Sequence, residues 1–487
     1  MINQVNQSNL SVPTSQVNQG QNIELYPGNW LYNAGVVGFL NVLCAYDKKY
    51  KSNLVNDILE KNEISYYNFD KLFNTKIDIQ FTPHINEKVP FWHWEYLFQT
   101  YLKYYGNIEN IVVSTFNMAK NTKYPKKQLL EKLINKKGNN YTGHNFTINK
   151  KDIDLSDVYK NVDNYWKDTF VNKQKITLEQ GINKTINELK KYENAIIYRK
   201  AVGILFSINC PYQNYYNQSY YKDMDNFIKY FTINKILQKK QSSNLNNTEN
   251  CDFCNTSYFN VSNIDLKMFS ILLPNFKNYP NSFWSNKLSY TQKICSLCEF
   301  LILHQHLAFT NLSDNTKIFI NAPSFELMYE LNKLIKELSK IDYKSTKELL
   351  AMSVIEYSLK INAILGNWLL MNIEIVAIDK KNNIEFINIP YNVLRIISNK
   401  KIAALLNDIG EFKILNIVLN EKYSELVEIA YRIMRIALKS KRNENDNKFL
   451  QDTIFLDKNK GSNYNLLWFS NKILNLYALI KETIKIK

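Results

Sequence analysis

Residues that carry enzyme chemistry are scarce in this sequence. Histidine occurs five times in 487 residues, and only His304 and His306 lie close together. The sequence has no catalytic-triad pattern, no metalloprotease motif and no Gly-x-x-x-x-Gly-Lys nucleotide-binding loop. A metal-dependent nuclease is the main alternative, with carboxylates at Asp152-x-Asp154 and Asp223-x-Asp225. Because the neighbours of these carboxylates are typical of surface turns, we expect a protein that is not an enzyme.

Targeting and membrane-spanning signals are also missing. The first twenty residues are polar and lack the basic start and apolar run of a secretory signal. The apolar stretch 363–378 is interrupted by Asn367, Asn372 and Glu374, so it does not make a clean transmembrane helix. We expect a cytoplasmic protein with no membrane partner.

Cysteine is rare too, but four of the six cysteines form two Cys-x-x-Cys pairs. These pairs are Cys251/Cys254 and Cys295/Cys298. In a chain without a secretory signal, such pairs disfavour a disulfide framework. Zn²⁺ prefers four ligands at tetrahedral corners, and each Cys-x-x-Cys turn supplies two of them. The pairs therefore predict a structural zinc site with no open coordination position.

Some features of this region leave alternatives open. Forty residues separate the pairs, more than the ~15–20 of a simple zinc ribbon, so we expect a small subdomain between them. Redox-active pairs or a coincidence of spacing are the other interpretations. The apolar surroundings of His304 and His306 favour core histidines over metal ligands, and those of Cys44 and Cys210 favour packed thiols.

The formal charge of +16 suggests an anionic partner, of which nucleic acid is the usual one. A chain rich in Asn, Lys, Ile and Tyr and poor in Gly and Pro also has the bias of a low-GC genome, which accounts for part of this charge. Two basic clusters are candidate contacts, one expected on a helix and loop and one as a stripe on a helix ending near Lys441. The candidate nucleic-acid-binding residues are Lys123, Lys126, Lys127, Lys136, Lys137, Arg432, Arg435, Lys439 and Arg442.

The hydrophobic patterns predict an α+β protein with several domains. Residues 1–22 are expected to be a flexible N-terminus, and 23–245 an irregular mixed α/β domain. In that domain we expect strands at 76–81, 108–116 and 195–208, and helices at 128–137 and 177–192. Residues 246–322 are expected to form a zinc-binding subdomain with a strand at 267–273 and a buried helix at 299–309. Residues 323–487 are expected to form a C-terminal helical bundle with helices at 323–340, 349–365, 391–409, 412–441 and 464–484.

The segment from Pro27 to Leu40 is the most distinctive motif in the chain, with the sequence PGNWLYNAGVVGFL. Its small residues allow another backbone or a ligand to approach closely. Its aromatic residues supply packing surface, or flat faces on which a base could stack. On these grounds alone we favour a close helix-packing motif. The residues of this motif are Gly28, Asn29, Trp30, Tyr32, Asn33, Gly35, Gly38 and Phe39.

This segment, followed by the two distant cysteine pairs, resembles the CXXC–CXXC family of CRISPR-associated proteins. These are large subunits of type I Cascade, mainly of type I-B systems. The resemblance covers three landmarks in order, which are residues 28–40, Cys251/Cys254 and Cys295/Cys298. The total length also suits such a subunit, and the sequence between the landmarks carries no further motif of the family.

The resemblance implies a non-catalytic subunit near the 5′ handle of the CRISPR RNA. Its N-terminal domain would help to recognise the protospacer-adjacent motif in double-stranded DNA, and its C-terminal bundle would line the path of the displaced strand. The implied partners are other Cascade subunits, the CRISPR RNA, target DNA with its displaced single strand, and a recruited helicase–nuclease that cleaves the DNA. A zinc-stabilised scaffold that binds only proteins is a further alternative.

Overall fold

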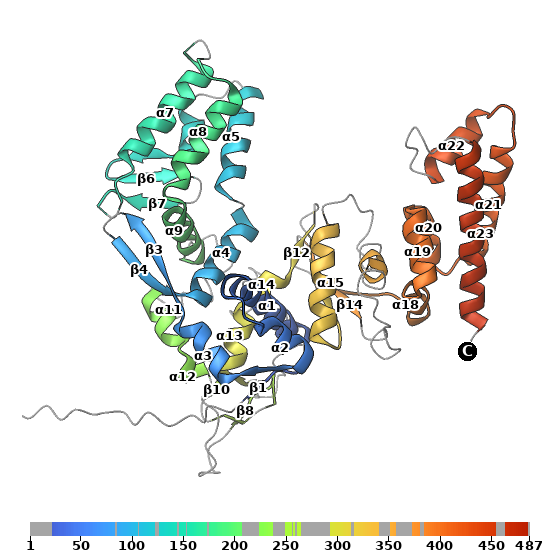
Figure 1. Ribbon diagram of the computed structural model, residues 1–487, viewed down its shortest axis with the longest axis horizontal. Helices are drawn as coiled ribbons and strands as arrows, with labels where there is room; N and C mark the ends of the chain where they lie inside the picture. Colours follow the sequence, from blue (N-terminus) through green and yellow to red (C-terminus); the bar gives the residue numbers. More distant parts are fainter. Residues whose placement is uncertain are drawn as a thin grey trace, which may run out of the picture.

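The computed structural model has an α+β fold, with many helices and several small antiparallel sheets (Figure 1). This agrees with the fold class expected from the sequence. The structure describes residues 22–82, 85–105, 107–121, 126–143, 146–151, 153–172, 175–206, 224–236, 249–255, 257–258, 261–263, 293–312, 316–339, 351–356, 373–379, 384–453 and 463–485. Residues 1–21 of the expected N-terminal tail, the expected strand at 267–273 and Cys210 lie outside these residues, whereas Asn22 begins a strand.

Helix α1 (Trp30–Tyr50) lies in the middle of the molecule (Figure 1). It begins at Asn29, whose side chain accepts a hydrogen bond from the backbone N–H of Tyr32 and so caps the first turn. Nearly every side chain from Leu31 to Leu43 is buried. A helix that is apolar on all sides must be surrounded by other elements, and α1 contacts α4 (Phe91–Tyr105), α13 (Ser296–Leu303), α14 (Gln305–Ala308) and α15 (Phe325–Leu338).

The elements that precede and follow α1 in the sequence are short. Strand β1 (Asn22–Glu24) pairs with β2 (Glu63–Ser65), and β3 (Lys76–Thr82) pairs with β4 (Ile85–Pro90). Helices α2 (Leu54–Lys61) and α3 (Tyr66–Asn74) lie between these strands in the sequence. The strand expected at 76–81 is confirmed as β3.

A second group of elements forms one end of the molecule (Figure 1). Its antiparallel sheet contains β5 (Asn135–Lys137), β6 (Asn140–Gly143) and β7 (Phe146–Asn149). Its helices are α5 (Ile108–Asn121), α6 (Lys126–Leu133), α7 (Ser156–Phe170), α8 (Leu178–Lys190) and α9 (Glu193–Phe206). The expected helix at 177–192 is confirmed as α8, which a capping box between Thr177 and Gln180 begins.

Two expected strands in this group are helices. Residues 108–116 lie in α5 and residues 195–208 largely in α9. In α5 the fully buried residues Ile108, Val112 and Phe116 recur every four positions, which is a helical period. The β-branched residues between them suggested a strand, but short apolar runs do not distinguish the two structures. The expected helix at 128–137 is also shorter than predicted, since 135–137 form β5.

The chain then contributes α11 (Met224–Tyr230), α12 (Ile233–Ile236) and the short elements around the cysteines. A four-stranded antiparallel sheet follows, in the order β12 (Thr310–Asn311), β13 (Lys317–Asn321), β14 (Glu374–Ile378) and β15 (Ile384–Asn388). Strands β14 and β15 correct the expectation that residues after 323 are nearly all helical. Because β14 pairs with β13, this sheet joins segments on both sides of the domain boundary expected at residue 323.

The C-terminal helices lie at the other end of the molecule (Figure 1). The helix expected at 391–409 is interrupted at Ser398, and the one expected at 412–441 is interrupted near Asn420. Gly410 ends its helix in the left-handed conformation, which glycine adopts without strain. Helix α15 begins after the N-cap Ser324, within the range expected for a helix at 323–340. Residues 351–356 are helical, as expected for the helix at 349–365. The helices are α18 (Tyr391–Ile397), α19 (Lys400–Ile409), α20 (Phe412–Leu419), α21 (Tyr423–Ala437), α22 (Glu444–Thr453) and α23 (Asn463–Lys485).

The helices of the described segments are too short or too polar to cross a bilayer. Even α1, the most enclosed of the long helices, has the charged residues Asp47, Lys48 and Lys49 in its last turn.

Lys200 of α9 is an unusual member of the core. Lys200 is only 2% exposed. Its Nζ lies 5.4 Å from the ring centroids of both Tyr101 and Phe146. Burial lowers the pKa of Lys200 to about 8. The aromatic faces offset part of the cost of burying a cation, but they do not replace water.

We predict that Lys200→Met stabilises the protein at pH 7. Between the lowered pKa of about 8 and the ordinary value of 10.5, the unfolded state binds more protons, so the wild type gains stability as the pH rises. The variant lacks this gain and should be more stable at pH 7 by about 2 kcal/mol. Urea unfolding at pH 7 and pH 9 measures both effects. Lys160→Met on the exposed face of α7 is the control, and an equal pH slope in wild type and Lys200→Met would refute the prediction.

Candidate metal centre

The four paired cysteines converge on one point. Sulfur atoms of Cys251, Cys254, Cys295 and Cys298 all lie within 4.8 Å of one another. The Sγ atoms of Cys254 and Cys295 are 3.8 Å apart. A tetrahedral Zn²⁺ with Zn–S bonds of ~2.3 Å places its ligands about 3.8 Å from one another. The cluster is therefore consistent with the structural zinc site that the sequence predicts.

The first pair lies on a tight turn between two short strands. Strand β8 (Glu249–Asn250) precedes Cys251 and pairs with β9 (Ser257–Tyr258). Asn255 adopts a left-handed conformation with φ of 54° and donates its N–H to the carbonyl of Cys251 at 2.8 Å. Asparagine is one of the few residues that enter this region readily. The turn therefore holds the thiols of Cys251 and Cys254 on the same side.

The second pair begins a helix. Strand β10 (Val261–Asn263) pairs with β11 (Lys293–Cys295), and Cys295 is the N-cap of α13. The sulfur of Cys295 accepts a hydrogen bond from the N–H of Cys298 at 3.4 Å. This hydrogen bond fixes the position of the Cys295 sulfur at the start of the helix. Residues 264–292, where we expected a small subdomain, lie outside the described residues.

The four thiols are close together and mostly buried, so they repel one another when they ionise. Three of them, at Cys251, Cys295 and Cys298, are fully buried, and Cys254 is half-buried. Burial raises the pKa of Cys295 well above its usual value, and the neighbouring thiols raise the pKa of Cys298 in the same direction. A divalent metal offsets this repulsion by binding the thiolates directly. Two redox pairs would not require all four sulfurs to converge, so the geometry favours metal over redox chemistry.

The segment around Gly28 packs against this cluster. A Cβ atom at Gly28 would lie 3.5 Å from the carbonyl oxygen of Phe253, between the first two cysteines. The ring of Tyr32 is buried, and its pKa is raised well above the usual value by burial and by the nearby thiols. Asn33 accepts a hydrogen bond from the N–H of Gly28 and donates to its carbonyl and to Asn321 Oδ1 on β13. The turn before α1 is thus fixed to the metal centre and to the sheet.

The small residues of the segment allow α1 to touch the helices after the second cysteine pair. A Cβ at Gly35 would lie 2.7 Å from the carbonyl oxygen of Leu301, and one at Gly38 only 1.9 Å from that of His304. Real Cβ atoms do not approach backbone so closely. The rings of Phe39 and Phe300 meet edge to face at 5.2 Å. The interpretation as a close helix-packing motif is therefore supported for these glycines.

His304 and His306 are core residues, as expected. Both are fully buried, His304 Nδ1 lies 2.9 Å from the carbonyl of Phe300, and His306 Nε2 lies 3.1 Å from Thr100 Oγ1. Neither belongs to the metal cluster. Burial lowers the pKa of His304 to about 4, so this ring is neutral at pH 7. Cys44 is half-buried and packs against the same core.

The expected basic stripe near the C-terminus is only partly helical. Helix α21 ends at Ala437, so Arg432 and Arg435 share it, whereas Lys439 and Arg442 follow it. The Arg432 guanidinium lies 3.9 Å from the ring centroid of Phe449, and Lys439 forms an ion pair with Asp446 at 2.7 Å. These two cations therefore also hold α22 against α21. On its other side α21 buries an apolar stripe of Leu426, Ile429, Ile433 and Ile436.

Exposed aromatic residues accompany this stripe, and our sequence analysis did not select them. Tyr431 is 58% exposed and precedes Arg435 by four positions, so the two share a helix face. On α23, Trp468 is 47% exposed and Lys472 Nζ lies 4.2 Å from its ring centroid. Aromatic residues four positions before a cation on a predicted helix were the signal available in the sequence.

The other basic cluster is described only in part. Lys136 and Lys137 are exposed on β5. Lys126 and Lys127 lie in the first turn of α6, with side chains outside the description, and Lys123 lies outside the described residues. Of these five lysines, the structure therefore describes the side chains of Lys136 and Lys137 alone.

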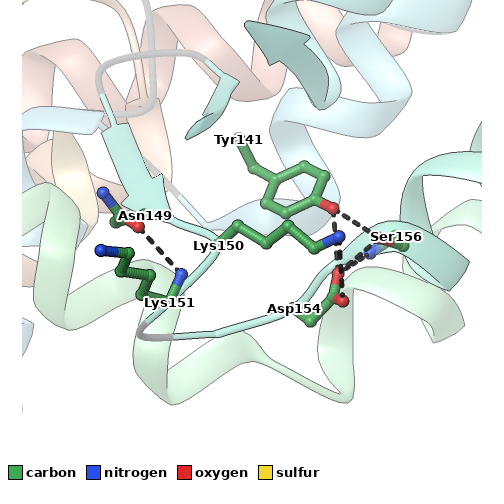
Figure 2. A network of polar contacts seen from close by, with 6 residues as sticks. All are labelled: Tyr141, Asn149, Lys150, Lys151, Asp154 and Ser156. Atoms are coloured by element: carbon green, nitrogen blue, oxygen red, sulfur yellow. Dashed lines mark hydrogen bonds and ion pairs between the residues drawn. The ribbon is translucent and has the colours of Figure 1, made fainter. Parts of the chain in front are cut away.

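Asp154 is one of the carboxylates that could serve a metal-dependent nuclease, but it has a structural role (Figure 2). Asp154 accepts hydrogen bonds from the N–H and hydroxyl of Ser156 at the start of α7 and from the hydroxyl of Tyr141, and Lys150 lies 3.6 Å away. The hydrogen bond from the Ser156 side chain is the main reason that the pKa of Asp154 falls to about 2. These partners occupy the carboxylate. Asp152 and Asp223 lie outside the described residues.

Comparison with known proteins finds no matching family model, no matching curated protein and no matching solved structure.

Proposed function

We propose that this chain is the non-catalytic large subunit of a type I CRISPR RNA-guided surveillance complex. The support is the resemblance of residues 28–40 and the two cysteine pairs to the CXXC–CXXC family. One observation strengthens it, because these landmarks lie far apart in the sequence yet share one interior. Tyr32 lies near the thiols, and Gly38 lies against the backbone of His304. A shared interior gives a physical reason for the landmarks to occur together.

In this proposal, zinc has a supporting role. The cluster fixes α13 and the turn before α1, and the N-terminal domain would contribute to recognition of the protospacer-adjacent motif and contact the CRISPR RNA 5′ handle. The net charge of +16 suits partners made of nucleic acid. The C-terminal helices would stabilise the displaced strand. Other Cascade subunits and a recruited helicase–nuclease complete the set of proposed partners.

The exposed residues Tyr431 and Arg435 suit this last role, and so does the exposed Trp468, whose neighbour Lys472 also forms an ion pair with Asp408 on α19. Single-stranded nucleic acid binds where bases can stack on aromatic faces and cations lie beside the phosphates. Both pairs combine these groups on helices α21 and α23, which pack together. A scaffold that contacts only proteins would not require them.

We predict that Arg435→Glu weakens binding of single-stranded DNA. Arg435 is exposed at the surface, so the change should not disturb the core. Loss of one phosphate contact should lower the slope of log affinity against log salt by about 1 and weaken binding at low salt by roughly tenfold. A salt titration followed by fluorescence anisotropy measures both quantities.

Lys160→Glu is the matched control, because it changes the net charge equally on α7, at the opposite end of the molecule (Figure 1). Equal losses in both variants would mean that only the total charge matters. Unchanged binding of Arg435→Glu throughout the salt series would exclude this residue as a contact.

The RNA that copurifies with this chain tests whether it belongs to the proposed surveillance complex. The tagged chain, purified from cells that also express the proteins encoded by its neighbouring genes, should retain RNA with a repeat-derived 5′ handle. Crosslinking within the purified complex should join this chain to that RNA and to target DNA. Protein partners without any such RNA would support the scaffold instead. Cleavage of labelled DNA by the purified chain with divalent metals would favour a nuclease.

A further inference from the structure

A cleft beside α1 is not used by the metal centre or by the candidate strand path. Its volume is about 550 Å³, within the roughly 300–1,000 Å³ of small-molecule sites. Four segments form it, namely one face of α1, the middle of α4, the turn from α14 into β12, and α15. The side chains from α1 are Val37, Asn41, Cys44 and Lys48, which follow a helical period and so line one wall.

The lining has cations at its edge and no carboxylate. Lys48, Lys333 and Lys336 are exposed residues that line the cleft, and it has no Asp or Glu among its lining residues. Lys333 is 3.6 Å from Glu330, whereas Lys48 and Lys336 pair with no carboxylate in the described part of the chain. Lys48 and Lys336, whose charges no described carboxylate offsets, therefore create a positive potential at this cleft.

The walls combine apolar surface with side-chain amides. Leu307 and Phe309 contribute apolar surface. Asn41 donates its amide N–H to the carbonyl of Leu307 at 3.2 Å, and Gln99 donates to Glu95 at 2.8 Å. Each amide therefore keeps its carbonyl oxygen for another donor. Asn332, by contrast, is occupied by the backbone of Ile320 and holds α15 against β13.

We propose that this cleft binds a nucleotide, with the base between the apolar walls and the phosphate beside Lys48 and Lys336. The amides of Asn41 and Gln99 suit the donors on the edge of a base. An acyl chain would offer no donor to the carbonyl oxygens of these amides, and a neutral sugar would leave the lysines without counter-charge. Both a free nucleotide and one unit of a single-stranded nucleic acid have the required chemistry. The inference does not depend on the assembly proposed above.

The test uses the full-length protein with unlabelled probes in titration calorimetry. The probes are the four ribonucleoside monophosphates, a five-nucleotide oligouridylate with a 5′-phosphate, and inorganic phosphate. A nucleotide should bind, and it should slow alkylation of Cys44, read by mass spectrometry of its peptide, because Cys44 lines the cleft. Binding of monophosphates identifies a free nucleotide as a ligand, and binding of the oligonucleotide alone identifies a unit of a longer strand.

Charge reversal locates the site. Lys48→Glu and Lys336→Glu should each weaken binding by about tenfold, whereas Lys401→Glu on α19 should leave it unchanged. Both lysines are exposed, so the variants should fold. Equal effects of all three substitutions would show attraction to the net charge alone and would overturn the proposal. It would also be overturned by equal binding of phosphate and nucleotide, or by no nucleotide binding at millimolar concentration.

Discussion

Replacing Cys298 with serine should release zinc and destabilise the N-terminal half of the protein. Cys298 is fully buried, and its sulfur lies within 4.8 Å of the other three sulfurs. Its loss therefore leaves only three thiolate ligands for the metal. Apparent binding free energies of structural zinc sites are roughly 10–16 kcal/mol, and much of this is folding free energy. We expect a loss of about 5 kcal/mol or more.

Metal analysis and thermal unfolding measure these effects together. The wild type should hold one zinc ion per chain, and Cys298→Ser should hold substantially less and unfold at a lower temperature. Cys44→Ser is the control, because Cys44 is half-buried and lies outside the cluster. A folded Cys298→Ser protein with the zinc content and melting temperature of the wild type would contradict the assignment.

Gly38→Ala should also be strongly destabilising, although Gly38 binds no metal and forms no side-chain interaction. In an unconstrained helix this substitution stabilises by about 1 kcal/mol, so the sign of the effect is informative. At Gly38 the added Cβ would lie 1.9 Å from the carbonyl oxygen of His304, and α1 would have to move away from α14. We expect a loss of about 3 kcal/mol, the upper part of the usual range for overpacking.

Chemical denaturation measures this loss of stability. The rate at which zinc is transferred to a chelator measures whether the substitution also loosens the metal centre. We expect faster exchange in Gly38→Ala, because α13 and α14 both rest on α1. Gly28→Ala is the matched control, since its Cβ would meet only ordinary contacts at 3.4 and 3.5 Å. A Gly38→Ala protein at least as stable as the wild type would show that α1 and α14 are not in close contact.

The metal site could be predicted from the sequence because its chemistry is local. Each Cys-x-x-Cys turn places two thiols together wherever it occurs, and only the meeting of the turns needed the structure. The start of α8 was predictable for the same reason, since Thr177 and Gln180 cap it from within four residues. The stop at Gly410 depends on one residue that enters the left-handed region without strain.

Features that depend on distant partners could not be predicted in this way. Strand β14 is five residues long and pairs with β13, which lies more than fifty residues earlier. Its apolar run fits a buried helix as well as a buried strand until that partner is known. The same limit applies to Gly38, whose sequence neighbours favour close packing but do not identify His304 as the partner. The cleft lysines Lys48 and Lys336 come from two helices that no local pattern connects.

The contact between α1 and α14 also has a consequence for how the chain is made. The ribosome adds about 5–20 residues per second, and α1 therefore emerges on the order of tens of seconds before α14. During this interval the nascent chain displays the apolar faces of α1 around Gly35 and Gly38 without their final cover. Growth at low temperature lengthens this interval and should increase the dependence of the nascent chain on chaperones that bind exposed helices. Truncated products that end before Cys295 should aggregate.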